Sequence, residues 1–275
     1  MDDQRPLAAL TIAGSDSGGG AGVQADLKTF AAHCVHGLSA ITALTAQHTS
    51  AIASMHVPPV AFLRDQIDAC FDDFHVGAVK VGMLATADVV LAVAEAIERH
   101  KPPAVVLDPV MVATSGAALL DRATRDLLIE RLLPLATLVT PNMPEAEMLL
   151  GYRITSSDDA EAAMDRLHAL GVCAVLLKGG HLDEGQTVVD RFSDGSTRRR
   201  FVHRRLVVNA HGTGCTLASA IAANLCRGEE LFSACRLAGD YVFAALLAGY
   251  RPGQGDVLVL DHFAARSTGN KKAGE

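Results

Sequence analysis

The fold is decided by the stretch GAVKVGML at residues 77–84, which DVVLAVAEAIERH at 88–100 and PAVVLDPVM at 103–111 follow directly. The first and third segments are short and rich in Val and Leu, which is typical of buried strands. The second repeats apolar residues at helical spacing. A strand, a helix and a second strand in this order predict a parallel pair joined by a right-handed crossover.

The same alternation continues on both sides of this unit. A strand is expected at 7–14, helices at 23–33, 62–74 and 128–135, and further strand or helix–strand steps at 136–142 and 162–180. Apolar strands separated by helices predict an α/β fold, with a single three-layer domain whose mainly parallel central sheet is flanked by helices. We expect this domain to cover residues 1–265 and a flexible tail to cover 266–275.

One segment departs from the alternation. TVVDRFSDGSTRRRFVH, residues 187–203, has the pattern of a hairpin that turns at Asp194 and Gly195. It predicts antiparallel strands at an edge of the sheet, with the three arginines 198–200 on a solvated strand.

Composition excludes several classes of function. The 275 residues carry a formal net charge of −7, which disfavours binding to nucleic acid or to an anionic membrane surface. No window approaches the roughly 18 apolar residues that a membrane span needs, and the N-terminus lacks the pattern of a signal peptide. The six cysteines form no CxxC pair, so we expect reduced thiols in a cytoplasmic protein.

Two glycine-rich loops each precede a predicted helix. The first, AGSDSGGGAGVQADLKTF at 13–30, lacks the later acidic residue of a dinucleotide fold, because no Asp or Glu lies between Asp26 and Asp65. It also lacks the glycine that precedes the lysine of a P-loop. Its many glycines instead favour close approach to a ligand. The second loop begins HGTGCTLASAIAANL at 211–225, where free N–H groups at a helix start suit an anion.

Charged residues follow three predicted strands. Asp108 ends one, Lys178 ends another, and Glu145 opens a helix just after a third. Taken alone, Glu145 could simply complement a helix dipole and Lys178 could simply be solvated. Together with the anion site they form the equipment of phosphoryl transfer, because carboxylates bind Mg²⁺ and a cation and N–H groups bind phosphate.

Several separate motifs occur along the chain in the same order as in a known enzyme family. They include TALTAQHT, KVGML, LDPVMVATSG, TPNMPEAE, KGGH and HGTGCTLASAIA. The chain resembles the hydroxymethylpyrimidine/phosphomethylpyrimidine kinases of thiamin biosynthesis, which have a ribokinase-like fold. The resemblance implies ATP-dependent phosphorylation of 4-amino-5-hydroxymethyl-2-methylpyrimidine and of its monophosphate. It also implies a requirement for ATP and Mg²⁺, a small-molecule substrate, and a homodimer. His48 stands where the family often has Asn.

The resemblance further implies roles for single residues. Those expected to bind the pyrimidine are Gly14, Asp26, Gln47, Met83 and Val110. Those expected near ATP are Asn142, Lys178 and Gly212, and those expected near the metal are Asp108 and Glu145. The expected catalytic group consists of Lys178, Gly212, Thr213, Gly214 and Cys215.

Cys215 stands where most sugar kinases of the superfamily carry aspartate. We expect the helix start to lower its pKa from about 8.5 toward neutral, so that the thiolate takes the proton of the hydroxymethyl group. A neutral thiol would also avoid repelling the phosphate acceptor of the second reaction. The alternative is that Cys215 is only a small buried residue.

Two other functions remain open. A pyridoxal/pyridoxine kinase would share the loop and the pocket, although Gln47 and Met83 favour a pyrimidine. A non-catalytic sensor of a thiamin precursor would not require Asp108, Glu145 and Lys178 together.

Overall fold

The computed structural model describes residues 5–112 and 120–264, so the tail expected at 266–275 lies outside the described residues. A nine-stranded sheet with the order β3-β2-β1-β4-β5-β6-β7-β8-β9 forms the centre of the chain. Its strands are β1 (Ala8–Asp16), β2 (His36–His48), β3 (Ala51–His56), β4 (Val76–Val81), β5 (Val105–Leu107), β6 (Leu138–Val139), β7 (Val175–Leu177), β8 (Thr187–Ser193) and β9 (Arg198–Arg204). A short parallel pair, β10 (Ala210–His211) and β11 (Leu258–Val259), lies apart from it.

The centre of the sheet is parallel and both edges are antiparallel. Strands β2, β1, β4, β5, β6 and β7 run in one direction, which confirms the predicted parallel sheet. At one edge β8 and β9 form the predicted hairpin, whose turn is held by the Asp194 carboxylate as it accepts hydrogen bonds from the N–H groups of Ser196 and Thr197. At the other edge β2 and β3 form a second hairpin that the sequence pattern did not reveal.

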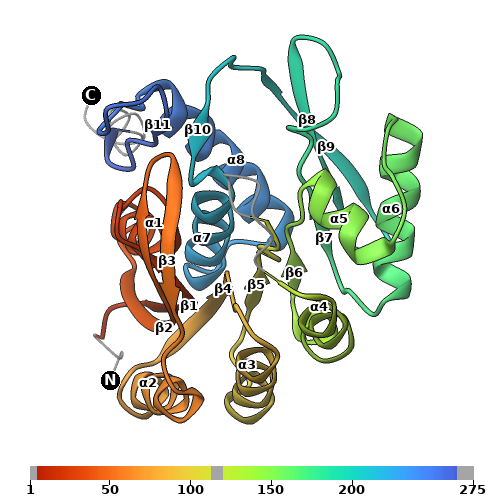
Figure 1. Cartoon of the computed structure of the whole chain (residues 1–275). Helices are drawn as coiled ribbons and strands as arrows, with labels where there is room; N and C mark the ends of the chain where they lie inside the picture. Colours follow the sequence, from red (N-terminus) through yellow and green to blue (C-terminus); the bar gives the residue numbers. More distant parts are fainter. Residues whose placement is uncertain (1–4, 113–119, 265–275) are drawn as a thin grey trace, which may run out of the picture.

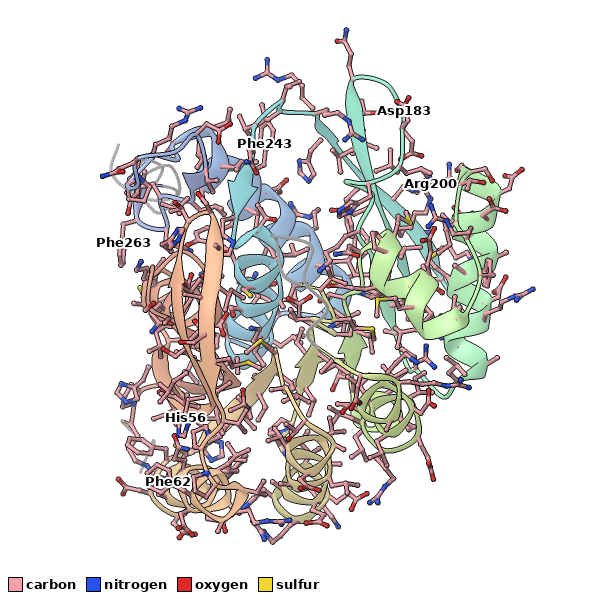
Figure 2. All side chains as sticks on the ribbon, in the orientation of Figure 1. His56, Phe62, Asp183, Arg200, Phe243 and Phe263 are labelled. Carbon is pink, nitrogen blue, oxygen red and sulfur yellow. The ribbon has the colours of Figure 1, made fainter. Side chains whose placement is uncertain are left out.

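Helices cover both faces of the sheet, as Figure 1 shows. Their bounds are α1 (Gly22–Ala32), α2 (Val60–Asp73), α3 (Ala87–His100), α4 (Arg122–Leu127), α5 (Met143–Leu150), α6 (Ser157–Ala169), α7 (Thr213–Cys226) and α8 (Leu231–Leu247). One apolar core packs the helices from α2 through α6 against one face of the sheet. A second core packs α1, α7 and α8 against the other face. Side chains fill both layers, while Phe62 and Phe263 lie at the periphery (Figure 2). The three-layer α/β prediction is therefore confirmed.

The helix expected at 128–135 is irregular. After α4 the chain forms a π turn over Leu128–Leu132 and a 3-10 turn over Leu133–Leu135. Pro134 lies in the second turn, and a proline has no N–H group with which to continue an α-helix. The expectation of a regular helix is therefore wrong in this segment.

None of the described helices is long and apolar enough to cross a membrane. The parallel strands determine where chemistry can occur, because their carboxyl ends share one edge of the sheet. Gly14 lies near the end of β1, and Asp108 and Lys178 directly follow β5 and β7. Residues that are far apart in sequence therefore come together at this edge.

The two leucines near the start of the chain test the packing. Leu10 of β1 is fully buried, whereas Leu7 just before the strand is 47% exposed. We expect Leu10→Ala to lower the free energy of unfolding by about 2–5 kcal/mol, because it leaves a cavity in the core. The same substitution at Leu7 should change it by about 0.5 kcal/mol or less. Urea denaturation measures both, and equal losses would contradict the placement of β1.

Candidate active site

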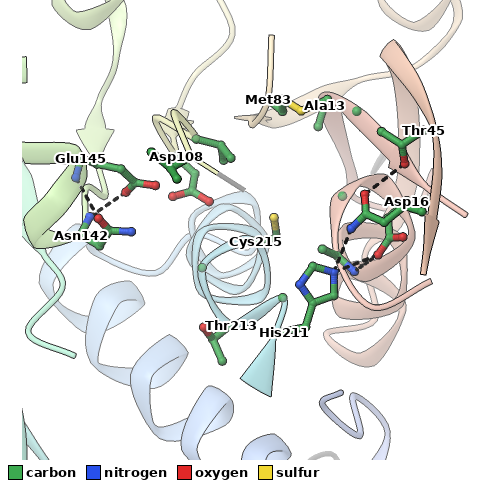
Figure 3. A pocket seen from close by; sticks show the side chains of 18 of the residues that line it. Ala13, Asp16, Thr45, Met83, Asp108, Asn142, Glu145, His211, Thr213 and Cys215 are labelled. Carbon is green, nitrogen blue, oxygen red and sulfur yellow. Dashed lines mark hydrogen bonds and ion pairs between the residues drawn. The ribbon is translucent and has the colours of Figure 1, made fainter. Parts of the chain in front are cut away.

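A cavity of about 470 Å³ lies at the carboxyl ends of the parallel strands (Figure 3). Twelve of the thirteen residues expected at the site line it, namely Gly14, Gln47, Met83, Asp108, Val110, Asn142, Glu145, Lys178, Gly212, Thr213, Gly214 and Cys215. Lys80, Asp16, Thr45 and His211 line it as well. One polar pocket is thus gathered from seven separate segments of the chain.

One side of the pocket is built around the Lys178 ammonium group. Its Nζ atom lies 2.8 Å from Oδ1 of Asp108 and 3.6 Å from Oε2 of Glu145. Burial opposes its charge, but the attraction of the two carboxylates outweighs burial and raises the pKa of Lys178. Burial also disfavours the charged form of Glu145, and it raises the pKa of this carboxyl group to about 7 although Lys178 has the opposite effect. This side of the pocket therefore holds a fixed positive charge and a carboxyl group that titrates near neutrality.

Local sequence explains why Glu145 faces the pocket. Asn142 caps α5 by accepting a hydrogen bond from the N–H group of Glu145 at 2.9 Å. The Glu145 carboxylate accepts one in return from the N–H group of Asn142 at 2.7 Å, which completes a capping box. The dipole role that was weighed for Glu145 is thus present, and the same side chain also contacts Lys178.

The start of α7 lies against this charged group. Gly212 caps the helix at φ 86°, and no side chain caps it. A Cβ atom at Gly214 would lie 3.1 Å from Lys178 Nζ and 3.4 Å from Asp108 Oδ2. The first N–H groups of α7 and the Lys178 ammonium therefore converge on the same space, which suits a phosphate group.

Cys215 lies on the first turn of α7, in the middle of the pocket (Figure 3). Burial raises the pKa of its thiol to about 11, and the nearby carboxylates of Asp26 and Asp108 add to this, although Lys80 opposes it. The expectation that the helix start lowers this pKa toward neutral is therefore wrong. A thiol with this pKa is neutral at neutral pH.

The other side of the pocket is less polar. A Cβ atom at Gly14 would lie 2.5 Å from Cε of Met83, so this glycine permits close packing against the methionine. Val110 and Ile52 add apolar surface, and the Gln47 amide supplies a polar group. A flat aromatic ring with polar substituents is the kind of ligand that fits such a wall.

Asp26 does not line the pocket, which corrects the expectation that it meets the pyrimidine. Its carboxylate is fully buried behind the pocket, where it pairs with Lys80 Nζ at 2.9 Å and accepts hydrogen bonds from Thr11 and Ser219. The helical spacing already contained a signal, because Asp26 lies three residues after Val23 and four before Phe30, on the buried face of α1.

Lys80 is a pocket residue that sequence reasoning missed. It lies in the middle of the apolar strand β4, where a lysine needs a buried partner. Burial lowers its pKa, but the Asp26 carboxylate more than compensates, so the pKa is raised and the ammonium remains charged. A lysine within an otherwise apolar strand is the signal that could have identified it.

The first glycine loop is organised by its own carboxylate. Asp16 accepts hydrogen bonds from the N–H groups of Gly18, Gly20 and Ala21 at 2.8–3.1 Å. Burial alone would raise the pKa of Asp16, but hydrogen bonds from His211 and from the Gly18 and Ala21 amides outweigh it and lower that pKa. These three amide groups are therefore already bound within the protein rather than free for a ligand.

The chain is similar to known proteins along most of its length. The sequence model of the phosphomethylpyrimidine kinase family matches residues 16–260. The chain is 49% identical over 246 residues to the hydroxymethylpyrimidine/phosphomethylpyrimidine kinase of Rhizobium meliloti, covering 88% of this chain and 91% of that protein. It is 50% identical over 247 residues to the thiamine biosynthesis bifunctional protein ThiED of Geobacter sulfurreducens, covering 90% of this chain but only 50% of that longer protein.

A solved structure is also similar. The ADP complex of Bacillus subtilis pyridoxal kinase superposes with a TM-score of 0.88 at 35% identity, covering 95% of this chain and 99% of that one. The fold is thus shared with a kinase whose name gives a different vitamin substrate.

The protonation of Cys215 can be measured by alkylation with iodoacetamide, with the exposed Cys173 as the reference thiol. Because only the thiolate reacts, we expect the Cys215 rate to rise about tenfold per pH unit from pH 7 to pH 10. Short pulses followed by peptide mass spectrometry give both rates in the same sample. A Cys215 rate that reaches a plateau near pH 8 would contradict the raised pKa.

Proposed function

The chain belongs to the phosphomethylpyrimidine kinase family and is a phosphotransferase of thiamin biosynthesis, and we propose that the pocket described above carries out both phosphorylations. The acceptors would be 4-amino-5-hydroxymethyl-2-methylpyrimidine and then its monophosphate, with ATP as the donor. The observation that carries this proposal is the convergence of Lys178, two carboxylates and the start of α7 on one cavity that also has an apolar, amide-bearing wall.

Phosphoryl transfer depends mainly on positioning and on charge stabilisation. In the proposed arrangement the Lys178 ammonium and the first N–H groups of α7 bind the transferred phosphoryl group. Asn142 and Gly212 lie beside the donor ATP. The ADP bound in the Bacillus subtilis pyridoxal kinase structure supports a nucleotide site in this fold.

We assign the magnesium ion to Asp108 and Glu145. Mg²⁺ usually takes one or two carboxylates from the protein and completes its shell with water and phosphate oxygens. Two carboxylates that share a lysine fit this requirement, and the described residues contain no cluster of three or more His, Cys, Asp or Glu suited to a metal. When bound, the ion would neutralise charge on the ATP phosphates.

The acceptor would lie on the apolar side of the pocket. Met83 and Val110 would contact the faces of the ring, and Gly14 would let it approach the backbone. The Gln47 amide offers donors and an acceptor, which suit a ring nitrogen beside an exocyclic amine. The hydroxymethyl group would then point toward Cys215 and the start of α7.

We propose that Cys215 contacts the acceptor oxygen as a neutral thiol. The loose transition state of phosphoryl transfer makes little demand on a base, so the alcohol proton can leave late in the reaction, to an oxygen of the transferred phosphoryl group. In the second step the acceptor is a phosphate, which an aspartate at this position would repel. A thiol with a raised pKa serves both steps because it carries no charge in either.

Specific observations bear on the two alternative functions, a pyridoxal kinase and a sensor without catalysis. Pyridoxal phosphorylation is the alternative that the structural similarity at TM-score 0.88 favours. A sensor without catalysis would not need Lys178 held between two carboxylates. The homodimer and the cytoplasmic location stay predictions from the resemblance and from the cysteine content.

The first test is ADP release by the purified chain with Mg-ATP. We expect turnover of the aminopyrimidine alcohol and of its monophosphate, little turnover of pyridoxal, and none of ribose at equal concentration. Turnover of pyridoxal alone would overturn the substrate assignment. Binding of the aminopyrimidine without turnover of any acceptor would favour a sensor.

The role of a neutral group at position 215 predicts a selective defect. Cys215→Asp should lower kcat/KM for the monophosphate about a hundredfold more than for the alcohol, because like charges repel strongly in a buried site. Cys215→Ala serves as the uncharged control and should show no such selectivity. Equal losses on both acceptors in Cys215→Asp would argue against this role.

A further inference from the structure

Gln47 lies in a small network on the acceptor side of the pocket. Its Nε2 atom is placed 3.2 Å from Nε2 of His211, and its Oε1 atom 3.1 Å from Oγ1 of Thr45. Asp16 completes the network, with its Oδ2 atom 3.2 Å from the same His211 nitrogen. Thr45, Asp16 and His211 lie together on one side of the pocket in Figure 3. Each contact has a reasonable length, so the protons decide which atoms donate.

The Thr45 hydroxyl has only one proton to give. That proton has its shortest partner in the backbone carbonyl oxygen of Ser15, at 2.8 Å. Toward Gln47 the hydroxyl oxygen can therefore only accept. An amide oxygen facing it would leave two acceptors in contact, whereas an amide NH₂ group would donate to it.

The His211 ring imposes the complementary condition. Its Nε2 atom faces the Asp16 carboxylate, which already accepts hydrogen bonds from Gly18, Gly20 and Ala21. A carboxylate held by so many donors is ionised and can only accept, so His211 Nε2 must carry a proton. An amide NH₂ group facing this N–H would place two donors in contact, whereas an amide oxygen would share the single Nε2 proton with Asp16 in a three-centre hydrogen bond, since both contacts are 3.2 Å long.

Both conditions are met if the amide oxygen and nitrogen exchange places. We propose that the Gln47 amide takes this reversed orientation, with its NH₂ group donating to Thr45 Oγ1 and its oxygen accepting from His211 Nε2, and that Thr45 and His211 are thereby positioning residues for the acceptor. The two amide ends have nearly the same shape, so the hydrogen-bond partners determine the choice. The distance of 3.1 Å then describes a hydrogen bond to Thr45, and that of 3.2 Å describes one branch of the hydrogen bond that His211 shares between Gln47 and Asp16.

The reversal has a consequence for recognition, which rests on the proposed function. After donating to Thr45 and accepting from His211, the amide retains one N–H and one lone pair for a ligand. A 4-aminopyrimidine offers a ring nitrogen that accepts and an amine that donates, which is the complementary set. The amide group cannot flip to suit another ring, because a flip would break its hydrogen bonds to both Thr45 and His211. Gln47 would therefore reject a ring that lacks the amine.

His211 also links this network to the phosphate side. It directly precedes Gly212, the residue that caps α7, and it is buried. The hydrogen bonds to Asp16 and Gln47 therefore fix the residue from which the anion site begins. The His211 side chain thus contacts the residue that orients the acceptor, while its backbone leads directly into the proposed phosphate site.

The orientation itself can be seen in the free protein. Neutron crystallography of deuterium-exchanged crystals should show the Thr45 deuteron directed at the Ser15 carbonyl oxygen and two deuterons on the Gln47 atom nearest Thr45. Two deuterons on the Gln47 atom nearest His211 would overturn the proposal. This result does not depend on which acceptor the chain phosphorylates.

The consequence for recognition is tested by calorimetry with two ligands, the aminopyrimidine alcohol and its analogue without the 4-amino group. We expect the unaltered chain to prefer the first by at least about tenfold. Thr45→Val removes the hydroxyl at nearly constant shape and should reduce this preference to about threefold or less, with ATP binding unchanged. Thr45→Ser keeps the hydroxyl and should restore most of the preference.

The outcomes separate the two proposals. An unchanged preference in Thr45→Val, or an equal loss in Thr45→Val and Thr45→Ser, would overturn the role of Thr45. A chain that neither binds nor phosphorylates the aminopyrimidine would instead overturn the proposed function, and the neutron map alone would then decide the amide orientation.

Discussion

Gly212, at the start of α7, lies so close to the first glycine loop that no side chain fits at this position. A Cβ atom at Gly212 would lie 1.9 Å from the backbone oxygen of Gly20, and one at Gly214 would meet Lys178 and Asp108. Gly212 also adopts a positive φ, which costs other residues strain. This contact brings the second glycine loop against the first and the start of α7 beside Lys178. The site depends on it, because the loop after β1 and the start of α7 both border the pocket and this contact holds them together.

Charge inside the pocket is arranged in pairs rather than as a general field. The chain is acidic overall, yet Lys80 and Lys178 both stay positive because carboxylates lie beside them. Asp16 is balanced in the same way by amides and by His211. An anionic ligand would therefore be attracted by local donors and not by the surface of the protein, which explains how a chain of this composition can bind phosphates.

Much of the fold and of the site could be predicted from the sequence, for physical reasons that particular segments illustrate. The unit at 77–111 changes clearly from a short apolar strand pattern to apolar residues at helical spacing and back. Asp108 and Lys178 follow apolar parallel strands, whose carboxyl ends must lie at the same edge of the sheet. The hairpin of β2 and β3 lacks such a signal, because polar and apolar residues mix along it and most of β3 is exposed. The pKa of Cys215 could not be inferred either, since it depends on burial and on carboxylates that come from other elements. Asp26 shows the reverse failure, where a motif suggested a ligand contact that the helical face excluded.

The ion pair of Asp26 and Lys80 has a consequence for how the sequence can change over time. The pair is fully buried and joins α1 to β4, with Thr11 of β1 and Ser219 of α7 completing the hydrogen bonds of the carboxylate. Removing one partner would strand a charge in the interior, at a cost of about 3–5 kcal/mol, whereas two apolar residues of matching volume could replace both. Selection should therefore remove single substitutions at either position. Relatives that differ here should differ at both positions, so positions 26 and 80 should covary.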